Sequence, residues 1–118
     1  MAVSEDSASG EPVWTEPVAA YLDRLDADRW AQITGRLELL KQLDGDGPLP
    51  DPPFVRVPRS PLVSLLVDYE GEVHQVVVGW EGGWILVHAF LDVDQAGRRR
   101  EYALARRLWD QHLKGLEG

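Results

Sequence analysis

The stretch PLVSLLVDYEGEVHQVVVGWEGGWILVHAF, residues 61–90, decides the fold. It is built from three apolar runs rich in β-branched residues, which are typical of strands, at positions 61–69, 73–80 and 84–91. Glu70-Gly71 and Gly82-Gly83 separate the runs, and glycine tolerates the positive φ that tight hairpins require. Because the runs are apolar at nearly every position, we expect an antiparallel meander that is covered on both faces.

A pair of amphipathic helices is expected before the meander. Thr15 is a candidate N-cap and Pro17 lies in the first turn, which predicts a helix over residues 16–26. Asp28 is a candidate cap for a second helix, which we expect to end at Asp44-Gly45. The apolar stripe of this second helix consists of Trp30, Ile33, Leu37, Leu40 and Leu43.

Shorter segments complete the predicted fold. Val13-Trp14 is expected to form an edge strand, and Phe54, Val55 and Val57 a short strand after the proline-rich segment 45–53. A closing helix is expected to begin at Asp94 or Gln95 and to end at Gly115, with an inner stripe of Tyr102, Ala105, Leu108, Trp109, His112 and Leu113. We predict an α+β fold in the order β-α-α-β-β-β-β-α, with a helical hairpin, a twisted and mostly antiparallel four-stranded sheet, and a C-terminal helix.

Length and composition indicate one domain. The chain has 118 residues and no cysteine, which excludes a disulfide scaffold, a thiolate zinc site and a cysteine nucleophile. We expect a disordered acidic tail at 1–12 and a single domain at 13–118. No apolar run reaches the roughly 18 residues that span a bilayer, and the first residues lack the apolar segment of a signal peptide. These features predict a cytoplasmic protein without membrane contact.

The charge is unevenly distributed along the chain. The formal net charge is −8, which disfavours a nucleic-acid binder that tracks the phosphate backbone, because each contacted phosphate needs a basic side chain, and we expect no DNA contact by the chain itself. Residues 1–97 hold 6 basic and 17 acidic side chains, whereas residues 98–118 hold 6 basic and 3 acidic ones. This basic block is either a solvated helix face or a contact surface for phosphate or an acidic partner.

Two histidines lie on neighbouring predicted strands. A two-residue loop between these strands places His74 and His88 on opposite faces of the sheet, and Gly82-Gly83 favours that loop. A three-residue loop, in which Trp80 pairs with Trp84, places both histidines on one face. We expect His88 to be a hydrogen-bonded core histidine. His74 is either a partly exposed residue without a catalytic role or a functional residue.

Polar and aromatic residues near the ends of the strands are further candidates. Asp92 and Asp94 follow the last strand, where one of them is expected to cap the closing helix. The run Arg98–Arg100 lies in the first turns of that helix, where the helix dipole disfavours cations, and such locally unfavourable residues sometimes mark a functional site. Trp80 and Trp84 flank a hairpin and are candidates for an exposed aromatic anchor that binds a partner.

Four strings of the chain resemble the RelE/HigB superfamily of type II toxin–antitoxin toxins, in particular its phage-derived HigB-like branch. TEPVAAYLDRLDADRWAQITGRLELL (15–40) is similar to the opening helical hairpin of that family, and LDGDGPLPDPPFVRVP (43–58) to its long loop and short strand. The stretch 61–90 is similar to its meander, with His88-Ala89-Phe90 where the family has a His-Gly-Phe-like string. REYALARRLW (100–109) is similar to its terminal helix. The resemblance covers about residues 13–114.

The resemblance implies a ribosome-dependent mRNA endoribonuclease that works without a metal or other cofactor and is silenced by a cognate antitoxin protein. In such an enzyme Lys and Arg side chains stabilise the charge that develops on the phosphate, and a Tyr or His assists proton transfer. The catalytic candidates carried over from this resemblance are His74, Arg98, Arg99, Arg100 and Tyr102.

Several basic positions of the family are replaced in this chain. Ser64-Leu65-Leu66 stands where the family has a Glu-Leu-Arg-like string, Val73-His74 where it has a Tyr-Arg pair, and residues 91–94 where it has a lysine-rich loop. The leading hypothesis is therefore a toxin of a bacterial toxin–antitoxin module with weak or no nuclease activity, whose partners are the antitoxin, the ribosome and mRNA. The alternative is a catalytically inactive domain of the same fold that binds a partner through Trp80 and Trp84. A weaker alternative is a metal-dependent hydrolase that uses His74, His88, Asp92 and Asp94.

Overall fold

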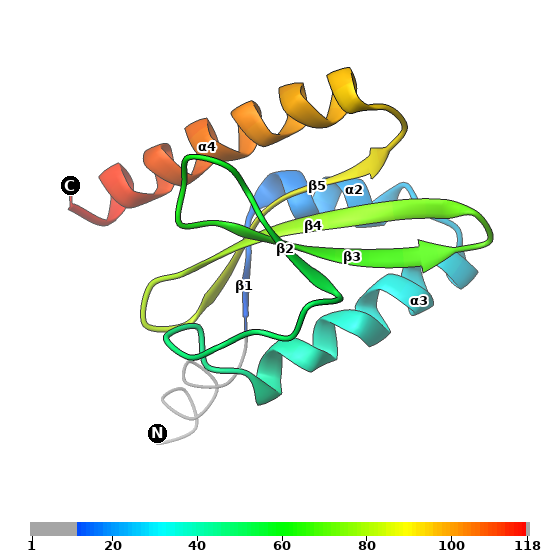
Figure 1. Cartoon of the computed structure of the whole chain (residues 1–118), viewed down its shortest axis with the longest axis horizontal. Helices are drawn as coiled ribbons and strands as arrows, with labels where there is room; N and C mark the ends of the chain where they lie inside the picture. Colours follow the sequence, from blue (N-terminus) through cyan, green and yellow to red (C-terminus); the bar gives the residue numbers. More distant parts are fainter. Residues whose placement is uncertain (1–11, 118) are drawn as a thin grey trace.

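One β-sheet lies between a helical hairpin and a long C-terminal helix in the computed structural model, which describes residues 12–117 (Figure 1). The elements are β1 (Val13–Trp14), α2 (Glu16–Asp23), α3 (Ala27–Leu37), the 3₁₀ helix η1 (Glu38–Gln42), β2 (Phe54–Arg56), β3 (Val63–Tyr69), β4 (Glu72–Trp80), β5 (Trp84–Asp92) and α4 (Gln95–Glu117). The predicted α+β class and element order are confirmed. The tail predicted at 1–12 lies outside the described residues except for Pro12.

The sheet has five strands rather than the predicted four, in the order β1-β5-β4-β3-β2. The additional strand is β1, which pairs in parallel with β5, whereas the other pairs are antiparallel. The β3–β4 hairpin turns through Glu70 and Gly71, whose φ angles of 48° and 86° are those of a tight two-residue turn. This part of the meander is formed as the sequence predicted.

The β4–β5 hairpin differs from its expected geometry. Trp80 pairs with Trp84, so the loop has three residues and the predicted two-residue loop is wrong. However, the register shifts along β5, because Val78 pairs with Leu86 whereas Val77 pairs with His88. Val87 is the extra residue of this β-bulge. The bulge brings His88 opposite Val77, and His74 and His88 consequently lie on opposite faces despite the longer loop.

Thr15 fixes this bulge from the neighbouring strand. Its backbone N–H donates to the carbonyl of Leu86, and its hydroxyl donates to the carbonyl of Val87 at 3.0 Å. Thr15 occupies the N-cap position of α2, as predicted, but its side chain makes no capping hydrogen bond. The hydroxyl instead pairs a carbonyl that the bulge leaves without a ladder partner.

The helical hairpin covers one face of the sheet. Its buried residues pack against alternate residues of β3, β4 and β5, and this core contains Val18, Leu22, Ile33, Leu37, Leu40, Leu65, Val67, Val76, Val78, Leu86 and Ala89. The predicted second helix is divided into α3 and η1, and Asp26 rather than Asp28 caps α3, because the Asp26 side chain accepts the N–H of Arg29. Trp30, which was expected in the apolar stripe, is 47% exposed.

The C-terminal helix α4 covers the other face. A second core lies beneath it and contains Val57, Leu62, Val77, Ile85, Val87, Phe90, Tyr102, Ala105 and Trp109. Trp109 packs directly on Gly79 of β4, where a Cβ atom would lie 2.6 Å from the indole ring. Glycine thus permits this close approach of α4 to the sheet. The helix continues past Gly115, the predicted end, to Glu117.

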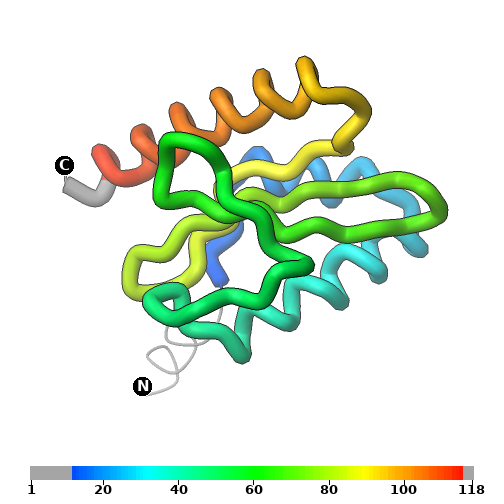
Figure 2. Tube along the Cα trace, viewed as in Figure 1, coloured from blue at the N-terminus to red at the C-terminus, as the bar shows by residue number. Residues whose placement is uncertain are grey.

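The turn between β2 and β3 extends away from the sheet and runs beside α4 (Figure 2). This turn contains Arg59, whose φ of 64° lies in the left-handed region that few residues other than glycine adopt. The Ser60 hydroxyl donates to the carbonyl of Val57 and accepts the N–H of Leu62, which closes the base of the turn. Among the described residues, no helix has the length and apolarity that crossing a membrane would need.

Candidate anion-binding site

A buried chain of polar side chains connects the sheet to α4. The Oε1 atom of Gln75, on β4, accepts the hydroxyl of Ser64 at 2.7 Å and the hydroxyl of Tyr102 at 2.6 Å. Its Nε2 donates to Asp92 at 2.9 Å, and Asp92 also accepts from Arg98 at 3.0 Å. Ser64 and Gln75 are almost completely buried. These hydrogen bonds therefore fix the position of the Tyr102 side chain relative to β3 and β4.

Both ends of this chain are held in defined protonation states. Burial raises the pKa of the Tyr102 hydroxyl, so the side chain remains neutral and donates its proton to Gln75. The hydrogen bond from Arg98 to the Asp92 carboxylate raises the pKa of that guanidinium further above its usual value. Arg98 is consequently a paired cation that holds the start of α4 on the sheet.

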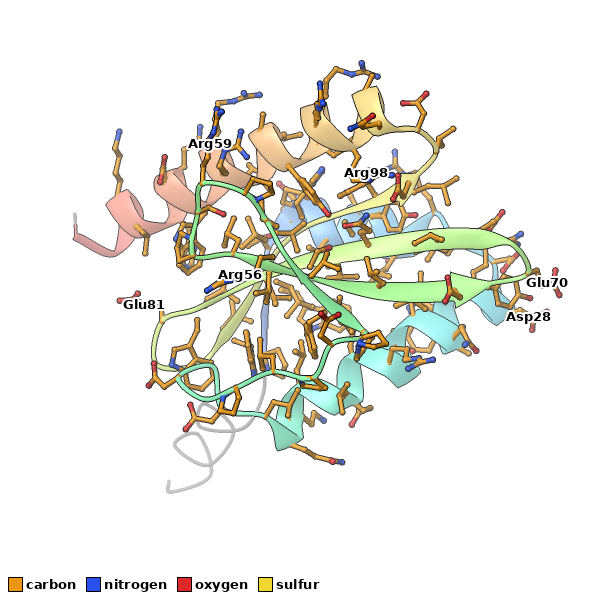
Figure 3. All side chains as sticks on the ribbon, viewed as in Figure 1. Asp28, Arg56, Arg59, Glu70, Glu81 and Arg98 are labelled. Atoms are coloured by element: carbon orange, nitrogen blue, oxygen red, sulfur yellow. The ribbon has the colours of Figure 1, made fainter. Side chains whose placement is uncertain are left out.

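Beside Tyr102 lies a cleft of about 410 Å³ between α4 and the β2–β3 turn. Its lining residues are Pro58, Arg59, Arg99, Tyr102 and Arg106. Residues 99, 102 and 106 follow helical spacing and share one face of α4. Figure 3 shows Arg59 beside α4, whereas the acidic residues Asp28 and Glu70 lie at the far end of the molecule. We refer to this space as the arginine cleft.

The arginine cleft concentrates positive charge without a compensating acid. None of its lining residues is a carboxylate, and none of its three guanidinium groups forms an ion pair with a described residue. Arg106 donates to the carbonyl of Pro58 at 3.1 Å, which joins the turn to the helix. Arg59 is held in a backbone conformation that costs free energy in a residue with a side chain, and such strain concentrates at functional sites. These properties are those of a site for an anion, in particular phosphate.

His74 does not belong to this cleft, because it points to the opposite face of the sheet. It is only 2% exposed, so the predicted partly exposed position is wrong. Its Nδ1 lies 2.6 Å from the hydroxyl of Tyr21 and its Nε2 lies 2.9 Å from Glu72. Because the Glu72 carboxylate can only accept, Nε2 donates to it, and in the neutral ring Nδ1 accepts from the Tyr21 hydroxyl.

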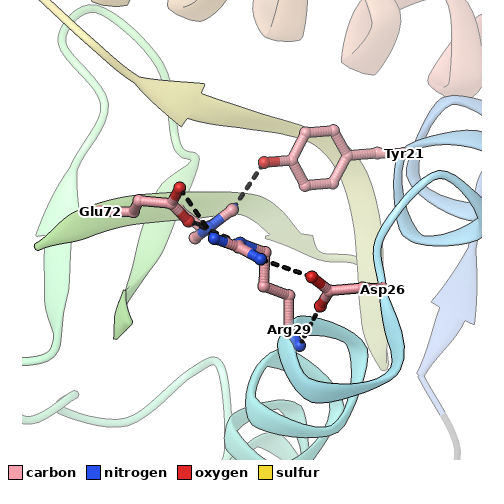
Figure 4. Close-up of polar contacts among 5 residues, drawn as sticks. Tyr21, Asp26, Arg29 and Glu72 are labelled. Carbon is pink, nitrogen blue, oxygen red and sulfur yellow. Dashed lines mark hydrogen bonds and ion pairs between the residues drawn. The ribbon is translucent and has the colours of Figure 1, made fainter. Parts of the chain in front are cut away.

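The His74 contacts extend into a network that ties the helical hairpin to β4 (Figure 4). Arg29 of α3 donates to both oxygens of Glu72, at 2.8 and 3.2 Å, and to the N-cap residue Asp26. The hydrogen bonds from Arg29 and then His74 lower the pKa of Glu72 to about 2, and burial raises the pKa of Tyr21 to about 12. Each member is thus paired within the network, which joins α2, α3 and β4.

The remaining predicted site residues are distributed as follows. Of the run Arg98–Arg100, Arg98 is paired with Asp92, Arg99 lines the cleft and Arg100 is exposed outside it. Asp94 caps α4, since it accepts the N–H of Gly97 at 2.7 Å. His88 is a buried histidine that lies 2.7 Å from Glu101, as the core interpretation predicted.

The tryptophan pair at the β4–β5 hairpin is largely internal. Trp84 is 6% exposed and donates its indole N–H to the carbonyl of Leu43, so the expected exposed anchor is wrong for this residue. Trp80 is partly buried, meets the Trp84 ring edge to face, and leaves no room for a side chain at Gly45. Their contacts hold the end of the helical hairpin on the sheet. Binding of a partner by this pair stays a prediction.

Sequence reasoning missed four residues around the site. Ser64 and Gln75 form the buried support of Tyr102, and Arg59 and Arg106 complete the cleft. A strand period of two places Gln75, not the neighbouring histidine, on the face toward α4, and helical spacing relates Arg106 to Tyr102. These signals were available in the sequence. The position of Arg59 depends on the β2–β3 turn and has no comparable local signal.

Neither a group of metal ligands among the described residues nor a similarity to known proteins bears on the arginine cleft. Within residues 12–117, no three His, Asp or Glu side chains gather where they could hold a metal ion, and His74 lies on the opposite face from His88. A larger groove of about 620 Å³ runs along β2 and the loop before it, and it is lined by apolar residues with one acid and one base, Asp51 and Arg56.

Comparison of the chain with protein-family models, curated proteins and solved structures finds no match.

Proposed function

We propose that the chain is a RelE/HigB-like toxin of a bacterial toxin–antitoxin module, which acts in the cytoplasm on translation and binds RNA in the arginine cleft. The observation that carries this proposal is that Arg59, Arg99 and Arg106 line one cleft beside Tyr102 and that no acidic residue is part of its lining. Arginine is suited to phosphate because its planar fork of donors pairs with two phosphate oxygens at once. The sequence resemblance to RelE/HigB toxins supplies the biological context, and a cognate antitoxin and the ribosome are the expected partners.

The chemistry available in the cleft is mainly electrostatic. The three guanidinium groups would stabilise negative charge on a phosphate, which is the larger part of catalysis in a metal-independent ribonuclease. Tyr102 is the one lining residue with a hydroxyl proton, and that proton is donated to Gln75. Tyr102 could accept a proton from the ribose only after losing its own, and burial, which raises the pKa of its hydroxyl, opposes that loss. We therefore propose strong RNA binding with weak cleavage.

The test is induced expression in a bacterial host, followed by growth and by incorporation of labelled methionine into protein. The proposal predicts growth arrest and reduced incorporation, both of which Arg99→Ala relieves. Arg107→Ala is the matched control, because Arg107 is an exposed arginine of the same helix that does not line the cleft. Normal growth with undiminished protein synthesis at high expression would refute the toxin assignment.

A second candidate function is a binding domain of the same fold without nuclease activity. It is favoured by His74, whose ring nitrogens are both occupied on the opposite face of the sheet. This candidate predicts that purified protein binds RNA but leaves it intact, with and without ribosomes. Cleavage products that appear with the wild type and disappear with Arg99→Ala would reject it.

A further inference from the structure

We propose that the arginine cleft recognises a terminal phosphate of RNA, a monoester with two negative charges, in preference to the internal diesters of the chain. This inference rests on the proposed function for the identity of the ligand as RNA, and it specifies which phosphate is bound. Three guanidinium groups line the cleft and no carboxylate does. A terminal phosphate carries a charge of about −1.5 to −2 at pH 7, whereas an internal diester carries a single charge. The excess of positive charge therefore matches the end of an RNA strand better.

Two elements bring the arginines of the cleft together. One wall is the β2–β3 turn, which carries Pro58 and Arg59, and the other wall is α4. The hydrogen bond from Arg106 to the carbonyl of Pro58 connects these walls. Cations from both walls can therefore pair with the oxygens of one phosphate, and a monoester offers three such oxygens and more charge than the two free oxygens of a diester.

The cleft also lacks an open aromatic face on which a base could stack. Its one aromatic lining residue is Tyr102, which is 8% exposed and meets the ring of Phe90 nearly perpendicularly. Stacking of bases on open aromatic faces is the usual source of affinity for single-stranded RNA. Without such a face, the contacts in the cleft are directed to phosphate oxygens. We expect binding that depends on the end group and is insensitive to the sequence.

The experiment compares short RNAs of one sequence that carry a 5′-phosphate, a 3′-phosphate or hydroxyls at both ends. Each phosphorylated RNA bears a fluorescent label at its other end and is compared with the unphosphorylated RNA labelled at that same end, while the wild-type chain is titrated and anisotropy is measured. At least one phosphorylated RNA should bind ten-fold or more tightly than the RNA with two hydroxyl ends. Tighter binding of one phosphorylated RNA than of the other shows whether the cleft binds a 5′-phosphate or a 3′-phosphate.

Variants separate the cleft from general attraction between RNA and arginine. Arg99→Ala and Arg106→Ala should reduce the preference for the phosphorylated end to less than three-fold, and Arg107→Ala should retain it. Circular dichroism and thermal unfolding of each variant exclude loss of folding as the cause. A preference that persists in Arg99→Ala and Arg106→Ala would place the phosphate elsewhere and overturn the proposal.

The outcomes also distinguish this inference from the proposed function. Equal affinity for all three RNAs, together with growth arrest on expression, refutes recognition of the end and leaves the toxin assignment in place. A clear preference for the phosphorylated end without growth arrest supports the cleft and rejects the toxin. Absence of binding to every RNA refutes the arginine cleft as an RNA site, and recognition of the end with it, whereas the toxin assignment is decided by the growth assay.

Discussion

Replacement of Gln75 by leucine should destabilise the protein strongly, because Gln75 is the shared partner in the buried polar chain. Leucine has a similar size, but it can neither accept from Ser64 and Tyr102 nor donate to Asp92. Each buried group that loses its partner costs about 1–3 kcal/mol. With two hydroxyl groups left unpaired and Asp92 retaining Arg98, we expect Gln75→Leu to lower the free energy of unfolding by about 4 kcal/mol.

The comparison with other variants makes this reasoning quantitative. Tyr102→Phe and Ser64→Ala each remove one hydroxyl whose partner keeps other contacts, so each should cost about 1 kcal/mol. The triple variant Ser64→Ala/Gln75→Leu/Tyr102→Phe removes the unpaired hydroxyls together with their acceptor. It should therefore be more stable than Gln75→Leu alone, although it carries two further substitutions.

Urea denaturation followed by tryptophan fluorescence measures these differences, because Trp109 lies in the core beneath α4 and reports its release. The urea concentration at the midpoint of unfolding should shift, whereas the slope of the free energy of unfolding against urea concentration should stay constant. The reasoning fails if Gln75→Leu costs no more than Tyr102→Phe. It also fails if the triple variant is less stable than Gln75→Leu.

Two further predictions concern the contacts on each face of the sheet. Gly79→Ala should lower the free energy of unfolding by about 1–3 kcal/mol, because the new methyl group would overlap the ring of Trp109. The control Gly35→Ala lies in an open position on α3 and should be neutral or stabilising. Thermal unfolding of both variants measures the difference. The pKa of Glu72 lies at about 2, below its unfolded value, so its stabilising contribution is present above about pH 4.5 and lost as the pH falls toward 2. Glu72→Gln should therefore flatten the dependence of stability on pH between 2 and 4.5, and an unchanged acid profile would show that the pairing with Arg29 does not contribute.

Local residue chemistry was sufficient to predict the meander and much of its surroundings. The turn at Glu70 and Gly71 follows from residues that accept a positive φ. The strands are apolar at nearly every position, which predicted that both faces of the sheet are covered, and both cores are present. The bulge at Val87 could not be predicted in this way, because it is stabilised by the hydroxyl of Thr15, which is 72 positions away in the sequence. That contact decides on which face His88 lies.

The candidate site was predicted in part. Arg99 lies in the predicted basic block and Tyr102 was a candidate from the family resemblance, but the histidine expected beside them belongs to a network on the opposite face. The family resemblance predicted that His74 stands at the position of an arginine, whereas the side chain of β4 that reaches Tyr102 is Gln75. Arg59 could not be found from sequence, since only the folded turn brings it to α4. The residue types of the site could therefore be read from the sequence, whereas the contacts between segments far apart in the sequence could not.

The most direct test of the central claim is the salt dependence of RNA binding, measured by anisotropy with a short single-stranded RNA. The three arginine side chains that would pair with phosphate charge, Arg59, Arg99 and Arg106, predict that the logarithm of the association constant falls with the logarithm of salt concentration with a slope of about −2. The triple alanine variant should bind far more weakly, with a slope near zero, while Arg107→Ala behaves like the wild type. A triple variant with the affinity and slope of the wild type would contradict the assignment of the arginine cleft as the RNA site.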